Sequence, residues 1–563
     1  MSEKLGYVVL EVGGIQKYIL STGKLKEMIG GSELIESLSD DYLTDFANNN
    51  GITVLDVVKK PVDNEILPLQ RNAGAMHLLF STASRGKEFL SKFGLQILED
   101  FPGLPIFGAL EECEFDSLGI RNAKFSLSNK ITDQRNKYPT STGMQLLPIC
   151  AEAPLDGEPA VGSVRYGNDS EKNEIISLSS KTRRIEKLIA SSRSRLREIE
   201  PDEEIDSELI WSDDLEEISG GFGKVAFIHI DGNDLGKRFR KELIKVSEQE
   251  EAENKKALET GIEINQEKRD KNTIRVINKM STLSKTVKET TVSAFKKGLT
   301  ACLKYAHLSD RKLVPARPLV LGGDDVTIVI RPDLALYFID AFVKEFERYS
   351  NKAFLEQNKN NPNANINDKL TVGVGMVVCP TGYPFLKAFD LSEELVKNAK
   401  ELTAHMENRV SSMDYIVITN DTENDLSSIR SHLYTSEDGL SLTAKPMLLK
   451  SGDLARFVKD SISVSEKLPR SAVRNALSEC KKGKEFADKC YSKLKDNINR
   501  GLGGRANQNL MTSEEFFNLF PEKNGFYYKD NNDKRFKTKL GDYIELNHLL
   551  SVYLNDYKEY FKF

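Results

Sequence analysis

Cysteine is scarce in this chain of 563 residues, which contains six cysteines and no Cys-x-x-Cys pair. Disulfide-stabilised folds are small and dense in cysteine, so a disulfide framework is excluded as the main support of a chain this long. Cys480 and Cys490 are the nearest two cysteines, and no histidine lies close enough in sequence to complete a zinc-binding pattern with them. We therefore expect reduced thiols and a cytoplasmic location.

Long apolar runs are also absent. The chain has no stretch of about 18 apolar residues, which is the length that a membrane-spanning helix needs. The opening residues MSEKLGYVVLEV lack the basic region and apolar core of a signal peptide. Together these absences predict that the chain has no membrane partner.

A strong excess of basic charge, typical of nucleic-acid-binding proteins, is missing as well. There are 79 Lys and Arg residues against 85 Asp and Glu, which gives a net charge of −6. The charge is uneven, since residues 441–510 contain 15 Lys and Arg against 7 Asp and Glu. Without interleaved aromatic residues, this local surplus is more typical of solvated helices than of an RNA-binding surface, although contact with RNA remains an alternative.

What the sequence does contain is one succession of elements that occurs twice. Segments 5–20 and 223–239 each predict a buried strand, a glycine-containing turn and the start of a helix. Each is followed by a hairpin, a helix and a further strand, within residues 66–115 and 317–379. The order β-α-β-β-α-β indicates two ferredoxin-like units in tandem within an α+β fold. The predicted domains are 1–150 and 220–440 for these units, 151–219 for a charged linker and 441–563 for a C-terminal helical domain.

Three aspartates of the second unit are predicted to converge at one end of its sheet. Asp231 closes the strand FIHID, and Asp324 and Asp325 belong to the Gly-Gly-Asp-Asp hairpin between the second and third strands. The end of the first strand lies beside this hairpin in such a unit, so the carboxylates would repel each other unless cations neutralised them. Two Mg²⁺ or Mn²⁺ ions would do so and would also bind substrate phosphates. Gly322 and Gly323 would let a triphosphate approach the backbone closely.

Further residues beside this predicted metal site are candidates for nucleotide binding. Gly232, Asn233 and Asp234 follow Asp231 and begin a helix, where backbone N–H groups face a bound phosphate or base. Lys400, on the helix after the fourth strand, is placed to reach a γ-phosphate. Each motif also has a structural alternative: an acidic hairpin turn, a helix cap and a solvated lysine. Because the Asp-Gly-Asn-Asp strand end and the Gly-Gly-Asp-Asp hairpin occur at equivalent places in one unit, we favour a binding site over these structural alternatives.

The first unit offers an internal comparison. In the sequence, Gly13 stands at the place of Asp231, and Ala75 and Met76 stand at the places of Asp324 and Asp325. The hairpin pattern is thus retained while these carboxylates are gone, so the aspartates are not needed to form the hairpin. We infer one catalytic unit and one degenerate unit.

These residues resemble those of a known family. A Gly-Gly-Asp-Asp hairpin preceded by a strand ending in Asp-Gly-Asn is similar to the palm/cyclase superfamily. It resembles more closely the large subunit of type III CRISPR effector complexes, the CRISPR polymerase or Cas-ten family, which carries this hairpin in the second of two palm domains. Segments 13–38 and 383–400 resemble the first palm and the part that follows the fourth strand of the second palm.

The resemblance implies a fold and an activity. The fold would be two tandem palm, or nucleotide cyclase, domains with a C-terminal helical domain. The activity would be conversion of ATP to cyclic oligoadenylate with release of pyrophosphate, in antiviral defence. Asp231, Asp324 and Asp325 would bind the metal ions, and the element Gly30-Gly31-Ser32 of the first palm would face a second, acceptor ATP.

The sequence also departs from this family. None of its six histidines is followed by aspartate, so we expect no cleavage of single-stranded DNA by a His-Asp nuclease. A second departure is the lack of a cysteine-rich zinc site between the units, where Cys150 stands alone. The implied partners are ATP, guide RNA and other effector subunits, or further copies of the chain if it is a stand-alone synthase. Two alternatives remain open: a cyclase with another cyclic product, and a non-catalytic scaffold subunit.

Overall fold

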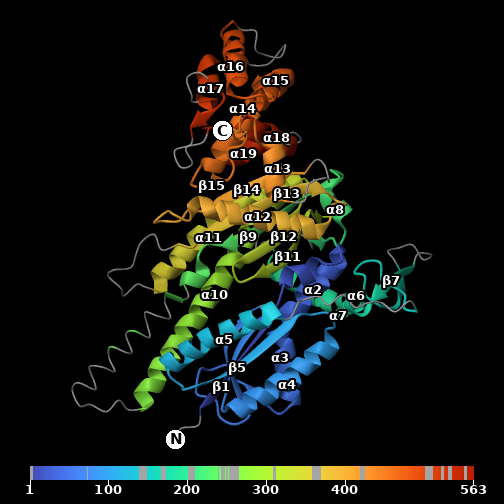
Figure 1. The fold of residues 1–563 in the computed structure, drawn as a ribbon, viewed down its shortest axis with the longest axis vertical. Coiled ribbons are helices and arrows are strands. Elements are labelled where there is room, and N and C mark those ends of the chain that lie inside the picture. The colour runs from blue at the N-terminus through green and yellow to red at the C-terminus, as the bar shows by residue number, and fades with distance from the viewer. Residues whose placement is uncertain are drawn as a thin grey trace. The chain divides into compact units, whose positions relative to one another are not determined.

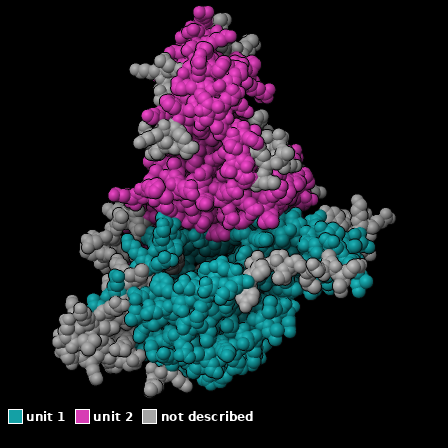
Figure 2. All heavy atoms as spheres, viewed as in Figure 1, with its two compact units in different colours: residues 1–200, 234–292, 319–324 teal, residues 201–233, 293–318, 325–563 magenta. Residues whose placement is uncertain are grey.

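The computed structural model describes residues 4–562 except 73, 138–148, 166–172, 201–208, 239, 242–247, 249–251, 253–265, 309–311, 358–368, 419–424, 501–510, 521–524, 530–535 and 551–553. The chain divides into two compact units (Figure 2). Unit 1 comprises residues 1–200, 234–292 and 319–324, and unit 2 comprises residues 201–233, 293–318 and 325–563. In the parts that the structure describes, no helix has the length and apolar character that crossing a bilayer requires.

Unit 1 is built around one mixed sheet (Figure 1). The elements of its first 200 residues are β1 (Leu5–Val12), α1 (Ile15–Leu20), α2 (Leu25–Leu38), α3 (Asp41–Asn49), β2 (Thr53–Val54), β3 (Glu65–Asn72), β4 (Ala75–Phe80), α4 (Ala83–Asp100), β5 (Ile106–Cys113), α5 (Ser117–Lys137), β6 (Ala160–Arg165), β7 (Asn173–Ser177), α6 (Leu178–Arg183) and α7 (Glu186–Glu198). The strand order is β2-β3-β4-β1-β5, and β1 is antiparallel to both of its neighbours.

Both faces of the unit 1 sheet are covered, which explains the nearly continuous apolar sequence of β1. Tyr7 and Val9 belong to a buried cluster that also contains Leu127 of α5. On the other face, Gly86 of α4 approaches the side chain of Val8. A strand that is buried on both faces has no need for alternating polar residues.

Residues 151–219, predicted as a charged linker, supply helices to unit 1. Helices α6 and α7 pack against α2. Glu27 of α2 is fully buried, accepts a hydrogen bond from Ser180 and forms an ion pair with Arg184. Glu33, also on α2, pairs with Arg195 of α7 at 3.2 Å between Oε1 and Nε. The charges of this segment therefore serve in part to hold α6 and α7 on α2 of unit 1.

Unit 2 contains a second mixed sheet and most of the helices. Its sheet elements and their helices are β8 (Ile210–Trp211), α8 (Leu215–Ser219), β9 (Lys224–Gly232), β10 (Leu313–Val314), β11 (Ala316–Gly322), β12 (Asp325–Ile330), η1 (Pro332–Leu334), α11 (Ala335–Gln357), β13 (Val372–Pro380), α12 (Phe385–Thr403), β14 (Ser412–Val417), α13 (Leu426–Leu433) and β15 (Met447–Leu448). Strand β11 belongs to unit 2 up to Pro318 and to unit 1 from Leu319. Helix α10 (Gln266–Tyr305) belongs to unit 1 up to Val292 and to unit 2 from Ser293.

The strand order of this sheet is β11-β12-β9-β13-β14-β15. Strand β9 is antiparallel to β12 and β13, and β14 is added parallel to β13. Its first four strands thus follow the order of β3-β4-β1-β5 in unit 1. Helix α12 packs against β9, β13 and β14.

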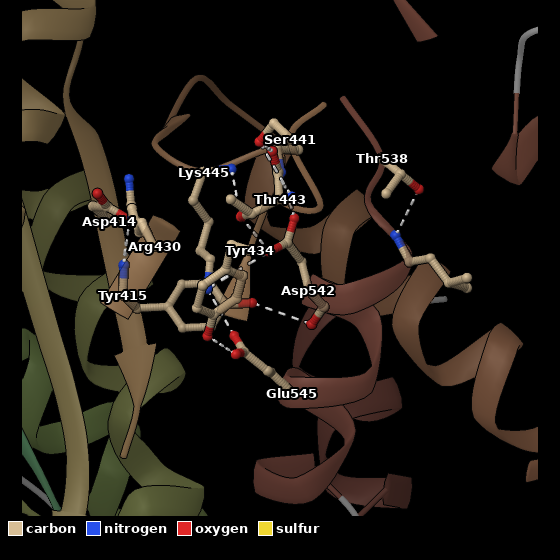
Figure 3. A network of polar contacts seen from close by, with 12 residues as sticks. Asp414, Tyr415, Arg430, Tyr434, Ser441, Thr443, Lys445, Thr538, Asp542 and Glu545 are labelled. Atoms are coloured by element: carbon tan, nitrogen blue, oxygen red, sulfur yellow. Dashed lines mark hydrogen bonds and ion pairs between the residues drawn. The ribbon is translucent and has the colours of Figure 1, made fainter. Parts of the chain in front are cut away.

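The C-terminal part of unit 2 is mainly helical. Its elements are α14 (Asp453–Lys467), α15 (Arg470–Lys481), α16 (Lys484–Asn499), α17 (Ser513–Leu519), β16 (Tyr528–Lys529), β17 (Phe536–Lys537), α18 (Leu540–Leu550) and α19 (Leu554–Phe561). A buried cluster connects α18 to the sheet (Figure 3): Lys445 pairs with Glu545 at 2.7 Å, and its Nζ lies 4.1 Å from the ring centre of Tyr415 on β14. Burial lowers the pKa of Lys445 to about 8.

The strand registers correct the comparison between the two units. Glu11 pairs with Phe107 in β1–β5, and Asp231 pairs with Gly373 in β9–β13. One anchor confirms this correspondence, because the N–H of Gly13 donates to Pro105 as the N–H of Asn233 donates to Thr371. Glu11, not Gly13, therefore stands at the place of Asp231.

The hairpin comparison shifts by one residue for the same reason. Met76 pairs with Leu10 as Val326 pairs with Ile230, so Gly74 and Ala75 stand at the places of Asp324 and Asp325. The prediction that used Ala75 and Met76 was wrong, because sequence similarity matched the glycine turns rather than the backbone pairing. Unit 1 lacks the hairpin carboxylates but keeps a carboxylate on its first strand.

Candidate active site

Asp231 lies near the end of β9 with its side chain accessible. The β12–β9 register pairs Val326 with Ile230, and the next step along it sets Asp325 opposite Asp231. Their side chains are 41% and 36% exposed. Because facing residues on antiparallel strands share one face of the sheet, the two carboxylates predicted to act together do lie on one face of unit 2.

Lys400 reaches this face from helix α12. Its Nζ donates to Asp231 Oδ2 at 2.6 Å and to the carbonyl oxygen of Gly232 at 2.7 Å. The route is open because Gly373, the partner of Asp231 on β13, has no side chain: a Cβ there would lie 2.7 Å from Cγ of Lys400. At Gly375 a Cβ would lie 2.3 Å from the carbonyl oxygen of Ser392, so this glycine also lets α12 lie close to the strand.

The hairpin between β11 and β12 turns over two residues, Gly323 and Asp324. Gly323 has a φ of 59°, in the left-handed region that favours glycine at the first position of a tight hairpin turn. Its carbonyl oxygen accepts a hydrogen bond from Thr291 of α10 at 2.6 Å. A Cβ at Gly323 would meet nothing within 4 Å, so the conformation of the turn, not a lack of space, explains this glycine.

His229 is the buried neighbour of the carboxylates. Its Nδ1 lies 3.4 Å from Asp325 Oδ1 and 3.1 Å from Oγ1 of Thr327. Burial lowers the pKa of His229, while the charge of Asp231 opposes this shift. The lowered pKa favours the neutral form of the imidazole.

Asn233 and Asp234 occupy different environments. Asn233 is buried and ties the end of β9 to Thr371: its backbone N–H donates to the Thr371 carbonyl at 2.8 Å and its Nδ2 to Oγ1 at 2.9 Å. Among the described residues its buried Oδ1 has no hydrogen-bond partner. Asp234 has a left-handed φ of 56° and pairs with Lys237 at 2.8 Å. Their contact with a base or ribose stays a prediction.

The carboxylates of Asp231, Asp324 and Asp325 do not form a complete set of metal ligands in this structure. Within the described ranges, no three or more His, Cys, Asp or Glu side chains are arranged to hold a metal ion. The donor chemistry nonetheless fits a hard divalent cation, since Asp231 and Asp325 share a face and are accessible to solvent. The roles of Asp231, Asp324 and Asp325 as metal ligands stay predictions.

One family model matches the part of the chain that carries this geometry. It describes the second palm domain of Cas10/Cmr2 and covers residues 224–410. Residues 224–410 are thus similar to a Cas10/Cmr2 second palm domain, and we refer to them below as the second palm domain. The resemblance predicted from the Gly-Gly-Asp-Asp hairpin and the Asp-Gly-Asn strand end is thus confirmed for this part of the chain. No curated protein matches the chain.

Several solved structures are similar to the chain. One is a Csm1–Csm4 cassette in complex with cA4, at 14% identity and a TM-score of 0.40, covering 71% of this chain and 53% of that chain. Another is Csm1 in T. onnurineus, at 13% identity and a TM-score of 0.42, covering 89% and 64%. A third is a type III-B Cmr-beta complex in the apo state, at 10% identity and a TM-score of 0.44, covering 98% and 82%. The chain spans about half the length of the first of these (53%).

The element Gly30-Gly31-Ser32, predicted to face an acceptor ATP, lies inside helix α2 of unit 1. A Cβ at Gly30 would lie 1.7 Å from the carbonyl oxygen of Arg183, so this glycine permits close packing of α2 against the end of α6. Gly31 is buried beside the same arginine, and Ser32 is half-buried. The packing accounts for Gly30, and the acceptor role of the element stays a prediction.

The sequence analysis missed two features of the second palm domain: the contact of Lys400 with Asp231, which has a counterpart in unit 1, and the role of Gly373. In unit 1, Arg135 of α5 pairs with Glu11 at 2.8 Å, as Lys400 of α12 pairs with Asp231 in the second palm domain. In both units the helix that follows the fourth strand thus sends a cation to the carboxylate near the end of the first strand. The second feature is Gly373, whose signal was the Val-Gly-Val-Gly run that begins β13.

Proposed function

We propose that the chain is a metal-dependent nucleotidyltransferase that converts ATP to cyclic oligoadenylate and releases pyrophosphate. One observation carries this proposal: within the second palm domain, Asp231 and Asp325 are the residues next to the paired Ile230 and Val326 of β9 and β12, and their side chains are accessible. Carboxylates of this kind are the oxygen donors that Mg²⁺ and Mn²⁺ prefer, and two such ions are used in phosphoryl transfer.

The proposal includes a domain arrangement. The two sheets, with the matching orders β3-β4-β1-β5 and β11-β12-β9-β13, would be two ferredoxin-like palm domains in tandem. The helices from α14 onwards would form a C-terminal helical domain. The first palm would be the degenerate one, since Gly74 and Ala75 stand where the second has Asp324 and Asp325.

The side chains would divide the work as follows. Asp231, Asp324 and Asp325 would hold two divalent ions, which supply activation of a ribose hydroxyl and stabilisation of the departing pyrophosphate. Lys400 would exchange its contact with Asp231 for a triphosphate oxygen, a charge-assisted hydrogen bond. Gly322 and Gly323 would leave the backbone of the hairpin open to the phosphates, in keeping with the free space beside Gly323.

The similarity to Cas10/Cmr2 also suggests binding partners, which we propose together with the activity. As a member of the Cas10/Cmr2 family the chain would assemble with other effector subunits and a guide RNA in antiviral defence. If it acts alone, the acceptor ATP would be presented by another copy of the chain or by its first palm.

A second candidate function is a non-catalytic scaffold subunit. It is favoured by the Glu11–Arg135 pair of unit 1, because the same carboxylate–cation pair exists there without the hairpin aspartates. The carboxylate–cation pair would then be a structural feature that both units share, as Glu11–Arg135 in unit 1 and as Asp231–Lys400 in unit 2.

The two candidates separate in one assay. Purified chain is incubated with ATP and Mg²⁺ or Mn²⁺, with and without RNA, and pyrophosphate and cyclic products are measured. Turnover that disappears in the Asp324→Asn/Asp325→Asn variant supports the synthase, and absence of turnover under every condition supports the scaffold. Preference for GTP would replace the adenylate product by another cyclic nucleotide and leave the metal mechanism intact.

A further inference from the structure

The part of helix α12 that carries Lys400 is fastened to β14 by two side-chain hydrogen bonds. Asn398 donates from Nδ2 to Asp414 Oδ2 at 2.8 Å. Ser412 donates from Oγ to the carbonyl oxygen of Ala399 at 2.7 Å. Both bonds involve the two residues that precede Lys400 on the helix, so they act on the helix turn from which its side chain departs.

Asp414 is a fixed acceptor for Asn398. Its side chain is fully buried, and its other oxygen accepts from the guanidinium of Arg430 and from the backbone N–H of Tyr415 (Figure 3). A buried carboxylate whose oxygens are all engaged has few alternative positions. The side chain of Asn398 on α12 is therefore bonded to an acceptor whose position is fixed by β14 and not by the helix.

Lys400 depends on the position of this helix turn. Its ammonium makes two short contacts, to Asp231 and to the carbonyl of Gly232, after its stem passes over Gly373. Apolar packing of Leu395, Val396 and Ala399 already holds α12 on the sheet. Non-directional packing leaves rotation of the helix less constrained than hydrogen bonds do. The hydrogen bonds to Asp414 and from Ser412 on β14 restrict this rotation of α12.

We propose that Asn398 and Asp414 are positioning residues for Lys400: their hydrogen bond sets the rotation of α12 at which the ammonium meets Asp231. In the reaction proposed above, on which this second part rests, the same bond sets Lys400 on the triphosphate. In this proposal both residues act on the substrate only through Lys400.

The first test needs no activity. The accessibility of Lys400 is measured by timed acylation with an amine-reactive ester and mass spectrometry of the full chain. In Asn398→Ala we expect the rate at Lys400 to rise about fivefold, the effect of losing one hydrogen bond. Lys397, exposed on the same helix, is the internal control and should not change. An unchanged rate at Lys400, or an equal rise at Lys397, contradicts the proposal.

Exchange of the two side chains provides a rescue. In Asn398→Asp/Asp414→Asn the donor and acceptor swap places, so the hydrogen bond can re-form. We expect the Lys400 rate to return to within about twofold of wild type, because one hydrogen bond is again present. Rates that stay as high as in Asn398→Ala contradict positioning by this bond. Ser412→Ala, which leaves Asp414 in place, tests the second contact and should give a smaller rise.

The second test concerns the substrate. Affinity for a non-hydrolysable ATP analogue with Mg²⁺ is compared in wild type, Asn398→Ala, Lys400→Met and the double variant. A loss in Asn398→Ala that vanishes in the Lys400→Met background supports the proposal, whereas additive losses show a general structural effect and contradict it. If wild type does not bind the analogue, the proposed function fails, while the acylation rates still decide whether Asn398 positions Lys400.

Discussion

Replacing Gly30 by alanine should destabilise unit 1. The new Cβ would lie 1.7 Å from the carbonyl oxygen of Arg183, a backbone atom that has no rotamer in which to avoid it. Helices α2 and α6 would have to separate, although Arg183 donates from Nη1 to the Tyr18 carbonyl at 3.0 Å and to Ser21 Oγ at 2.9 Å. Overpacking and a weakened hydrogen bond together amount to about 2–4 kcal/mol of unfolding free energy.

Gly94→Ala is the matched control for this substitution. Gly94 also lies within a helix of unit 1, α4, and a Cβ there would meet nothing within 4 Å. Alanine at this position should therefore stabilise the unit by about 0.5–1 kcal/mol. Both variants are compared with wild type by urea unfolding. If Gly30→Ala is as stable as wild type, the packing argument is refuted, and an increased KM for ATP in that variant would favour the acceptor role predicted from the sequence.

Three further substitutions have defined outcomes. Burial lowers the pKa of His77 to about 3, so below pH 6.5 the unfolded chain binds a proton that the folded chain does not. We therefore expect the free energy of unfolding, measured by urea titration, to fall by about 2 kcal/mol between pH 6.5 and 5. His77→Gln should remove this decline. Lys400→Met should raise the KM for ATP about tenfold, because a charge-assisted hydrogen bond to the triphosphate is lost. It should change the free energy of unfolding by less than about 1 kcal/mol, because Asp231 is partly exposed; an unchanged KM together with a larger loss of stability would contradict the role of Lys400 in binding ATP. Lys445→Met removes the ammonium that pairs with buried Asp542 and half-buried Glu545, and it should lower the free energy of unfolding by about 3 kcal/mol; a stable variant would show that the cluster is dispensable.

The succession of elements and the placement of Asp231 beside Asp325 could be read from the sequence. Strands such as VAFIHID are apolar on both faces and end at a glycine turn, and this local pattern survives in the fold. The order of the strands then places neighbouring ends together, whatever the details of packing. The Gly-Gly-Asp-Asp hairpin likewise follows from turn chemistry, because Gly323 adopts a left-handed φ.

Register and helix packing could not be read in this way. The place of Glu11 is decided by which backbone groups pair, and similarity of the glycine turns pointed to Gly13 instead. Lys400 looked like a solvated lysine or a phosphate ligand, whereas its contact with Asp231 depends on how closely α12 approaches Gly373. Gly30 matched a family motif, and its contact with Arg183 involves a residue 153 positions away in the chain.

Pyrophosphate release from ATP in the presence of Mg²⁺ or Mn²⁺ tests the central claim most directly. Wild type is compared with Asp324→Asn/Asp325→Asn and with Asp231→Asn, each checked for folding by its unfolding transition. We expect turnover in the wild type, with or without an RNA activator, and a loss of at least about a hundredfold in each folded variant, because metal-ion catalysis supplies several kcal/mol. Wild-type turnover that persists in folded variants lacking these carboxylates would contradict the account.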